Sequence, residues 1–207
     1  MTKNYPAHRF FHKSDSQEYR FENSFRGILY AIRHKYVWID IDSNWCWSDD
    51  RKTRIALAVH WGTVGGDKFH DPLGKIKPGT KWRDLTLSEA KRLVTPEGTH
   101  VRTMIEMLDN AKKRGMKGIE WELKGGPWPV DVFLPVLQHA KAIKIQIWIK
   151  TLHEIPGSFH RLQHAHAATT SVGWGKTVLL NHAKAPVALA ITQRAYIDYV
   201  HGKWKKA

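Results

Sequence analysis

With 207 residues, the chain is long enough for one domain with a sizeable core, and we expect a single domain over residues 1–207. Apolar residues make up 42% and charged residues 25%, proportions that exclude a disordered or fibrous protein. The 33 Lys and Arg outnumber the 19 Asp and Glu, and the net charge of +14 favours anionic partners such as phosphate esters, nucleic acid or acidic membrane surfaces.

The basic residues are spread along the whole chain, and only "HGKWKKA" at the end is a local cluster. Such a spread is more typical of a solvated surface than of a nucleic-acid stripe, although the net charge leaves nucleic acid open as a partner. Cys46 is the single cysteine, which excludes an intramolecular disulfide and a multi-cysteine zinc site. Since neither a signal peptide nor a membrane-spanning apolar stretch is evident, we expect a soluble, cytoplasmic protein. Its oligomeric state is left open.

Strand and helix patterns alternate along the chain. Two helices are predicted by apolar spacing of i, i+3, i+4 and i+7, at 23–35 and at 100–115, with Gly115 as the C-cap of the second. The predicted strands are 4–8, 36–41, 54–60, 117–123 and 143–150, with weaker ones at 177–181 and 186–192. This alternation predicts an α/β fold, a compact (β/α)8 TIM barrel in which one late unit is reduced. A doubly wound open sheet is the alternative, but its Gly-rich phosphate fingerprint is missing from the first strand-to-helix turn.

Polar side chains stand where the first four predicted strands end. They are His8 and Arg9, Asp40 and Asp42, His60, and Glu122 with Lys124. Residues two apart on a strand share a face, so the two aspartates of "WIDID" point opposite to its isoleucines, and Glu122 and Lys124 point opposite to Trp121 and Leu123. Carboxylates gathered at a barrel mouth repel one another unless a cation lies between them, and oxygen ligands suit one divalent ion, Mg²⁺ or Ca²⁺.

The same residues also have plainer interpretations. The aspartates could be a solvated strand end, and His60 could be a packed histidine. Glu120 has the same parity as Glu122 and could be the metal ligand in its place, or the buried partner of a lysine. Trp45, Trp47 and Trp61 flank the predicted site and could either bind a choline-like group by cation–π contact or simply pack.

Taken in order, the motifs "AHRF", "FENSF", "WIDID", "AVHW", "DLTLSEAKRL" and "IEWELK" resemble those of the glycerophosphodiester phosphodiesterases, which share a TIM barrel with the sphingomyelinase D-like phospholipases. The resemblance covers about residues 5 to 125. The short length and the His-Trp variant also resemble compact phage-type members of the family.

The resemblance implies a role for each matching position. His8 and His60 would form the acid–base pair, and Arg9 and Lys124 would contact the substrate phosphate. Glu22 and Asn23 would support the site. The implied metal ligands are Asp40, Asp42 and Glu122.

The chain departs from the family pattern at several positions. Asp40 stands where the family usually has Glu, Trp61 where it has Asp, and Phe10 where it has Gly. A second histidine, His70 in "FHDP", looks more like the family's His-Asp, but it follows a Gly-rich loop, and we prefer His60.

The resemblance therefore predicts a metal-dependent phosphodiesterase that hydrolyses glycerophosphodiesters or similar small phosphodiesters to an alcohol and glycerol phosphate. Two alternatives remain: a phospholipase D-like enzyme that releases a lipid head group, and a catalytically weak barrel that binds an anionic polymer through its positive charge.

Overall fold

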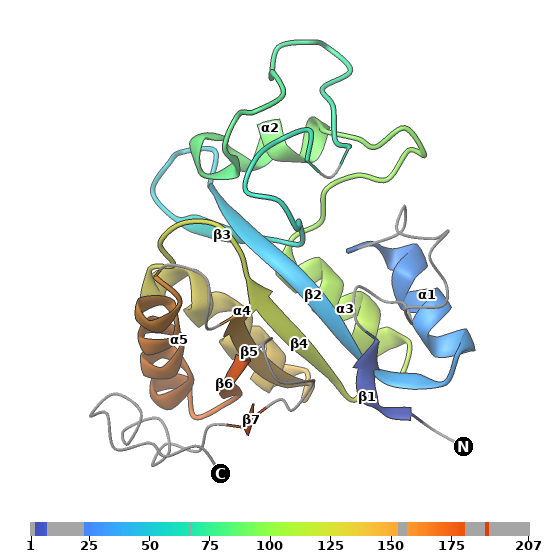
Figure 1. Ribbon diagram of the computed structural model, residues 1–207, viewed down its shortest axis with the longest axis vertical. Helices are drawn as coiled ribbons and strands as arrows, with labels where there is room; N and C mark the ends of the chain where they lie inside the picture. Colours follow the sequence, from blue (N-terminus) through green and yellow to red (C-terminus); the bar gives the residue numbers. More distant parts are fainter. Residues whose placement is uncertain (1–2, 8–22, 67, 153–156, 181–188, 191–207) are drawn as a thin grey trace.

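The computed structural model describes residues 3–7, 23–66, 68–152, 157–180 and 189–190. Figure 1 shows a twisted sheet with helices packed against it and a separate group of loops above the long second strand. The strands are β1 (Lys3–Ala7), β2 (Tyr36–Trp47), β3 (Arg54–Leu57), β4 (Gly118–Leu123), β5 (Gln146–Leu152), β6 (Lys176–Leu180) and β7 (Leu189–Ala190). The helices are α1 (Phe25–Arg33), α2 (Leu87–Arg92), α3 (Met104–Lys113), α4 (Val130–Ala142) and α5 (Ser158–Val172), with a 3-10 turn, η3 (Trp82–Asp84), before α2.

The sheet has the order β1-β2-β4-β5-β6-β7, and its first five strands are parallel. The α/β class predicted from the sequence is therefore confirmed. The strand order follows the chain without the reversal of a doubly wound sheet, so every crossover runs in the same direction. Within the described residues β1 and β7 remain the two ends of this path, and closure into a complete barrel is not shown.

The third predicted strand differs from the prediction. Residues 54–60 were expected to form a parallel barrel strand ending at His60, but β3 spans only Arg54–Leu57 and pairs antiparallel with the second half of β2. The physical reason is the connection: the six residues between the two strands make a hairpin turn, whereas a parallel crossover needs a dozen residues or more. His60 therefore follows the hairpin and does not end a barrel strand.

The two faces of the sheet differ as the strand periodicity predicts. The isoleucines of β2 and β5, with Ile119, Trp121 and Leu123 of β4, are buried against the helices. α1 begins after Ser24, whose hydroxyl accepts a hydrogen bond from the Gly27 backbone N–H at 3.1 Å and so satisfies one of the free donors of the first turn. The face of β2, β4 and β5 that points away from these apolar side chains carries the polar side chains.

A second, smaller core lies in the segment between β2 and α3, which forms the upper part of the molecule in Figure 1. Trp82, Leu57 and Leu93 are fully buried in it, and so is Cys46 at the far end of β2. Burial raises the pKa of the Cys46 thiol to about 12, so the thiol stays protonated at neutral pH. This segment stands over the carboxyl end of β2, beyond Asp40 and Asp42 in the middle of that strand.

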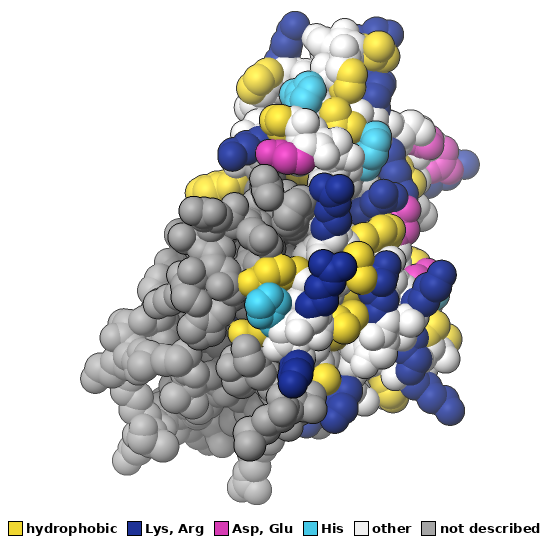
Figure 2. All heavy atoms as spheres, turned by 90° about the vertical axis from the view of Figure 1, so that its right-hand side faces the viewer, with side chains coloured by type: hydrophobic (Ala, Val, Ile, Leu, Met, Phe, Trp, Pro, Cys, Tyr) yellow, Lys and Arg dark blue, Asp and Glu magenta, His cyan; other side chains and the backbone are white. Residues whose placement is uncertain are grey.

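The positive charge is spread over the surface. Figure 2 shows Lys and Arg side chains along the whole height of the described part of one face, separated by uncharged and hydrophobic side chains, with few acidic ones. No helix in the described ranges is both long and apolar enough to cross a membrane.

On the polar face of the sheet, the rings of two tryptophans from β2 and β5 meet over a glycine of β4. The rings of Trp38 on β2 and Trp148 on β5 have centroids 4.8 Å apart, and Gly118 on the intervening β4 leaves the room that they occupy. A Cβ atom at Gly118 would lie 2.3 Å from the Trp38 ring. We expect Gly118→Ala to lower the free energy of unfolding by about 1–3 kcal/mol, because the ring must move out of a packed position.

Urea unfolding measures this change. Gly62→Ala is the matched control, since a Cβ atom at Gly62 would meet nothing within 4 Å. Equal free energies of unfolding for the two variants would contradict the prediction, because they would show that the Trp38 ring can move without loss of stability.

Candidate functional site

The polar face of the sheet carries a compact group of charged side chains where its central strands β2, β4 and β5 pair with one another. The parallel register pairs Asp40 with Glu120, and pairs Asp42 with Glu122, which in turn pairs with Lys150 of β5. All five side chains are buried. Strand periodicity and register together therefore bring four carboxylates from two neighbouring strands onto one small surface.

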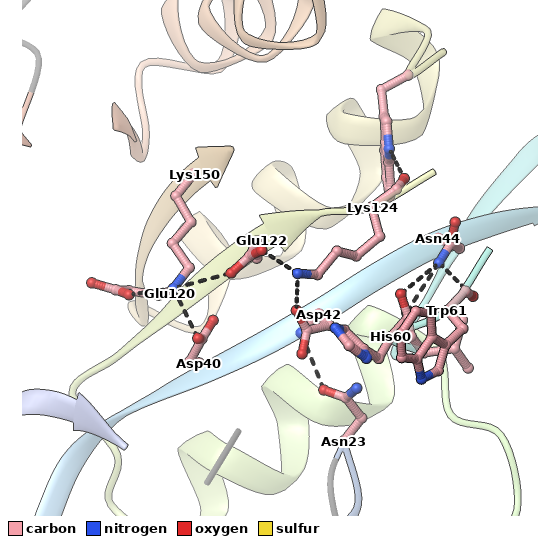
Figure 3. A network of polar contacts seen from close by, with 12 residues as sticks. Asn23, Asp40, Asp42, Asn44, His60, Trp61, Glu120, Glu122, Lys124 and Lys150 are labelled. Atoms are coloured by element: carbon pink, nitrogen blue, oxygen red, sulfur yellow. Dashed lines mark hydrogen bonds and ion pairs between the residues drawn. The ribbon is translucent and has the colours of Figure 1, made fainter. Parts of the chain in front are cut away.

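Lys150 lies at the centre of three of these carboxylates (Figure 3). Its Nζ atom is 2.8 Å from Asp40 Oδ2, 3.0 Å from Glu120 Oε2 and 3.4 Å from Glu122 Oε2. Burial disfavours the charged ammonium, but the attraction of the three carboxylates outweighs burial and raises the pKa of Lys150 above its ordinary value. The group therefore remains a cation inside the fold.

Glu120 is the buried partner of a lysine, one of the two roles that the sequence left open. Burial raises the pKa of Glu120, and so do the nearby Asp40 and Glu122, although Lys150 lowers it. The raised pKa means that Glu120 takes up a proton more readily in the folded protein than an exposed glutamate does.

Lys124 forms the second cationic contact of the group. Its Nζ atom lies 3.0 Å from Asp42 Oδ1 and also contacts Glu122 Oε1. Burial disfavours its charge, yet the attraction of Asp42 and Glu122 raises its pKa. Lys124 is more exposed than Lys150, at 15% against 5% of the side-chain surface. It is therefore the ammonium group that an incoming anion can reach.

The group carries more negative than positive charge. Four carboxylates against two ammonium groups leave two negative charges when all are ionised. In the part of the chain that the structure describes, however, no three acidic, His or Cys side chains converge in a metal-binding arrangement, because the two lysines lie between the carboxylates. Asp42 and Glu122 share the exposed Lys124, whereas Asp40 is held by the buried Lys150.

Asn23 reaches the same group from the start of α1. Its Oδ1 atom accepts a hydrogen bond from the Asp42 backbone N–H at 3.1 Å. Asn23 has a φ of 51°, in the left-handed region that asparagine tolerates better than most residues. The contact ties the segment before α1 to the strand that carries Asp40 and Asp42.

His60 is brought to this end of the sheet by Asn44. The Asn44 side-chain amide donates to the carbonyl oxygens of Val59 at 3.1 Å and Trp61 at 3.0 Å, which holds the chain on either side of His60 against β2. The His60 ring is buried and meets the Trp61 ring edge-on, with centroids 4.8 Å apart. Figure 3 shows it on the Asp42 side of these contacts.

His70, the other candidate histidine, is exposed on a loop of the upper segment. Its neighbour Asp71 has a structural role there. The Asp71 carboxylate binds the forked guanidinium of Arg92 at 2.9 and 3.0 Å and accepts backbone N–H groups, among them that of Ile76 at 2.9 Å. The hydrogen bonds from Arg92 hold the pKa of Asp71 well below its usual range. The "HDP" stretch therefore anchors a loop.

The tryptophans expected near the site differ in exposure. Trp45 is buried, its indole N–H donates to the Pro127 carbonyl oxygen at 2.8 Å, and the Arg54 guanidinium lies over the rings of Trp45 and Trp47. Trp61 is 54% exposed. Packing accounts for the first two, and of the three only Trp61 presents most of its ring to solvent.

Three predicted site residues, His8, Arg9 and Glu22, lie outside the described residues. One residue of the group was missed: Lys150 ends "IQIWIK", where the alternation that placed Asp40 and Asp42 also places Lys150 on the polar face. The signal was present in the sequence.

The sequence matches no family model and no curated protein. Among solved structures, the fold is similar to the crystal structure of a glycerophosphodiester phosphodiesterase from Parabacteroides distasonis. The TM-score is 0.50 at 17% sequence identity, and the match covers 84% of this chain and 82% of that chain. At this identity the likeness shows a shared fold.

Proposed function

We propose that this protein is a phosphodiesterase that hydrolyses glycerophosphodiesters or similar small phosphodiesters to an alcohol and glycerol phosphate. The observation that carries the proposal is the site: Asp42, Glu122 and Lys124 gather where the parallel pairing of β2 with β4 ends, close to the segment in which Asn44 holds His60. The fold similarity to the Parabacteroides distasonis enzyme supports the same class of reaction.

In this proposal Lys124 and Arg9 bind the phosphate oxygens of the substrate. Lys124 is suited to this role because its ammonium is largely buried, which strengthens its interaction with an anion. It is also partly exposed, so it can exchange its contact with Asp42 for a contact with a substrate oxygen. His60 and His8 hold and transfer the proton that the leaving alcohol requires. Asn23 and Glu22 support the site, Asn23 through its hydrogen bond to Asp42.

A divalent ion, Mg²⁺ or Ca²⁺, is part of the proposal. Asp42 and Glu122 would hold it together with Asp40, because carboxylate oxygens are the ligands that such ions prefer. The bound ion would polarise the phosphate and neutralise its negative charge. The ion would compete with Lys150 for Asp40 and with Lys124 for Asp42 and Glu122, and the more exposed Lys124 is the easier of the two to displace.

Turnover of bis(p-nitrophenyl) phosphate and of glycerophosphocholine tests the proposal. We expect hydrolysis that EDTA abolishes and that added Mg²⁺, Ca²⁺ or Mn²⁺ restores. Glu122→Gln, which keeps the shape of the side chain and removes its charge, should lower the rate by at least about 100-fold. Absence of turnover with every metal would contradict the proposal.

The spread of positive charge supports a second candidate, binding of an anionic polymer. In the described part of the face drawn in Figure 2, Lys and Arg side chains outnumber the acidic ones and are spread among uncharged side chains. Such binding would weaken steeply with salt and would need no metal. Release of a lipid head group has less support, because Trp61 and Leu73 are the exposed large hydrophobic side chains in the described part of the chain.

A further inference from the structure

A cavity of about 210 Å³ opens beside the carboxylate group, at the carboxyl ends of β2 and β4. Its lining includes Asn44 of β2, Gly125 and Gly126 after β4, and Lys81 and Arg83 from the upper segment. Since a water molecule takes up about 30 Å³ in the liquid, the cavity has room for a phosphate-sized group and a few waters.

The charge of this cavity is positive. Lys81 and Arg83 contribute two cations, and the lining contains no acidic side chain. Among the described residues, neither cation has an ion pair, whereas Arg92 and Arg54 of the same segment are paired with Asp71 and Asp131. Lys81 is exposed and Arg83 is partly buried, and two cations without a described acidic partner that line one small space favour an anion there.

The two glycines keep the space open. A Cβ atom at Gly126 would lie 2.6 Å from Arg83 Nη1, and one at Gly125 would lie 2.4 Å from Asn44 Oδ1. Gly125 also has a φ of 67°, a conformation that other residues rarely adopt. The Arg83 guanidinium therefore rests against bare backbone, with its donors beside the cavity.

Residues that line the cavity are close neighbours in the chain of residues in the proposed catalytic group. Gly125 directly follows Lys124, and Asn44 is two residues beyond Asp42 on the same face of β2, about 7 Å along the strand. A substrate whose diester phosphate contacts Lys124 can thus extend its other end into the cavity.

We propose that this cavity binds a second anionic group of the substrate, a phosphate monoester, so that the preferred substrates are phosphodiesters that carry a terminal phosphate. The position of the diester rests on the phosphodiesterase function proposed above. Binding of an oxyanion in the cavity does not depend on that function and can be measured separately.

The first measurement locates the anion without reference to catalysis. Inorganic phosphate is titrated into the ¹⁵N-labelled protein at 150 mM NaCl, which screens the scattered surface charges. We expect saturable shifts of the Gly125 and Gly126 amide signals. The phosphate affinity measured from these shifts should fall at least tenfold in Arg83→Gln. It should be unchanged in Lys75→Gln, which removes an equal charge from an exposed position outside the cavity.

Gly126→Ala tests whether binding depends on the position of the Arg83 guanidinium as well as on its charge. It changes no charge, and its Cβ atom meets only the far end of the Arg83 side chain, which can swing aside without disturbing the fold. We expect it to weaken phosphate binding as Arg83→Gln does. Shifts that are absent from Gly125 and Gly126, or that survive both variants, would overturn the proposal.

Kinetics then test the substrate class. For a p-nitrophenyl diester of glycerol phosphate that carries a second, terminal phosphate, Arg83→Gln should raise KM about tenfold with little change in kcat. For bis(p-nitrophenyl) phosphate, which has no second anionic group, the same variant should leave KM unchanged. Equal effects on both substrates would overturn the assignment. Lack of turnover by the wild-type protein would instead contradict the phosphodiesterase function, while the phosphate titration would still decide whether the cavity binds an anion.

Discussion

Replacement of Lys150 by methionine should lower the free energy of unfolding by about 3–5 kcal/mol. The substitution keeps most of the apolar stem but removes the ammonium that lies between Asp40, Glu120 and Glu122. Three buried carboxylates would then face one another without their shared cation, which is the costly way to break a buried ionic group. Urea unfolding at pH 7 measures the loss.

The loss should depend on pH. Burial already raises the pKa of Glu120 with Lys150 present, and removal of the cation, which lowers it, raises the Glu120 pKa further above its unfolded value of about 4. The folded variant then binds more protons than the unfolded chain, so its stability falls as the pH rises. We expect Lys150→Met to be closer to the wild type at pH 5 than at pH 8.

Lys52→Met is the control, because Lys52 is 81% exposed and its contact with Asp50 is 3.9 Å long. It should change the stability by less than about 1 kcal/mol. A loss of the same small size for Lys150→Met would mean that Lys150 does not hold the carboxylates together. Partial recovery in the double variant Lys150→Met, Glu120→Gln would show that repulsion between carboxylates causes the loss.

His60→Ala should lower kcat for bis(p-nitrophenyl) phosphate by about 10²–10⁴-fold, the usual effect of removing a group that transfers a proton. The fold should remain, because the Asn44 amide holds the chain on either side of His60 through the Val59 and Trp61 carbonyl oxygens, which the substitution leaves in place. A lower kcat with little change in KM, and an unfolding curve close to that of the wild type, would separate the chemical role from a structural one.

His70→Ala is the matched variant for this test. His70 is exposed on the loop that Asp71 anchors, and its removal should leave kcat unchanged. Full activity of His60→Ala together with loss of activity in His70→Ala would transfer the role to His70. His8→Ala should behave as His60→Ala does if the two histidines act as a pair.

Much of the site could be predicted because it depends on short-range regularities. Residues two apart on a strand share a face, so "WIDID" and "IEWEL" alone place Asp40, Asp42, Glu120 and Glu122 opposite the apolar side chains that meet the helices. The same rule applied to "IQIWIK" would have found Lys150. The rule was less useful for β3, because it says nothing about which strand is the neighbour or in which direction it runs.

The α/β class and the faces on which the residues of β2, β4 and β5 lie can be derived from the sequence alone. These follow from backbone periodicity, which acts over a few residues. Three further features are visible only in the folded chain: β3 turns back along β2, Lys150 lies among three carboxylates, and Arg83 and Gly126 meet at one cavity. These are contacts between residues up to 110 positions apart, and they depend on strand register and on the path of the segment above β2, because no local pattern specifies which distant side chains share a space.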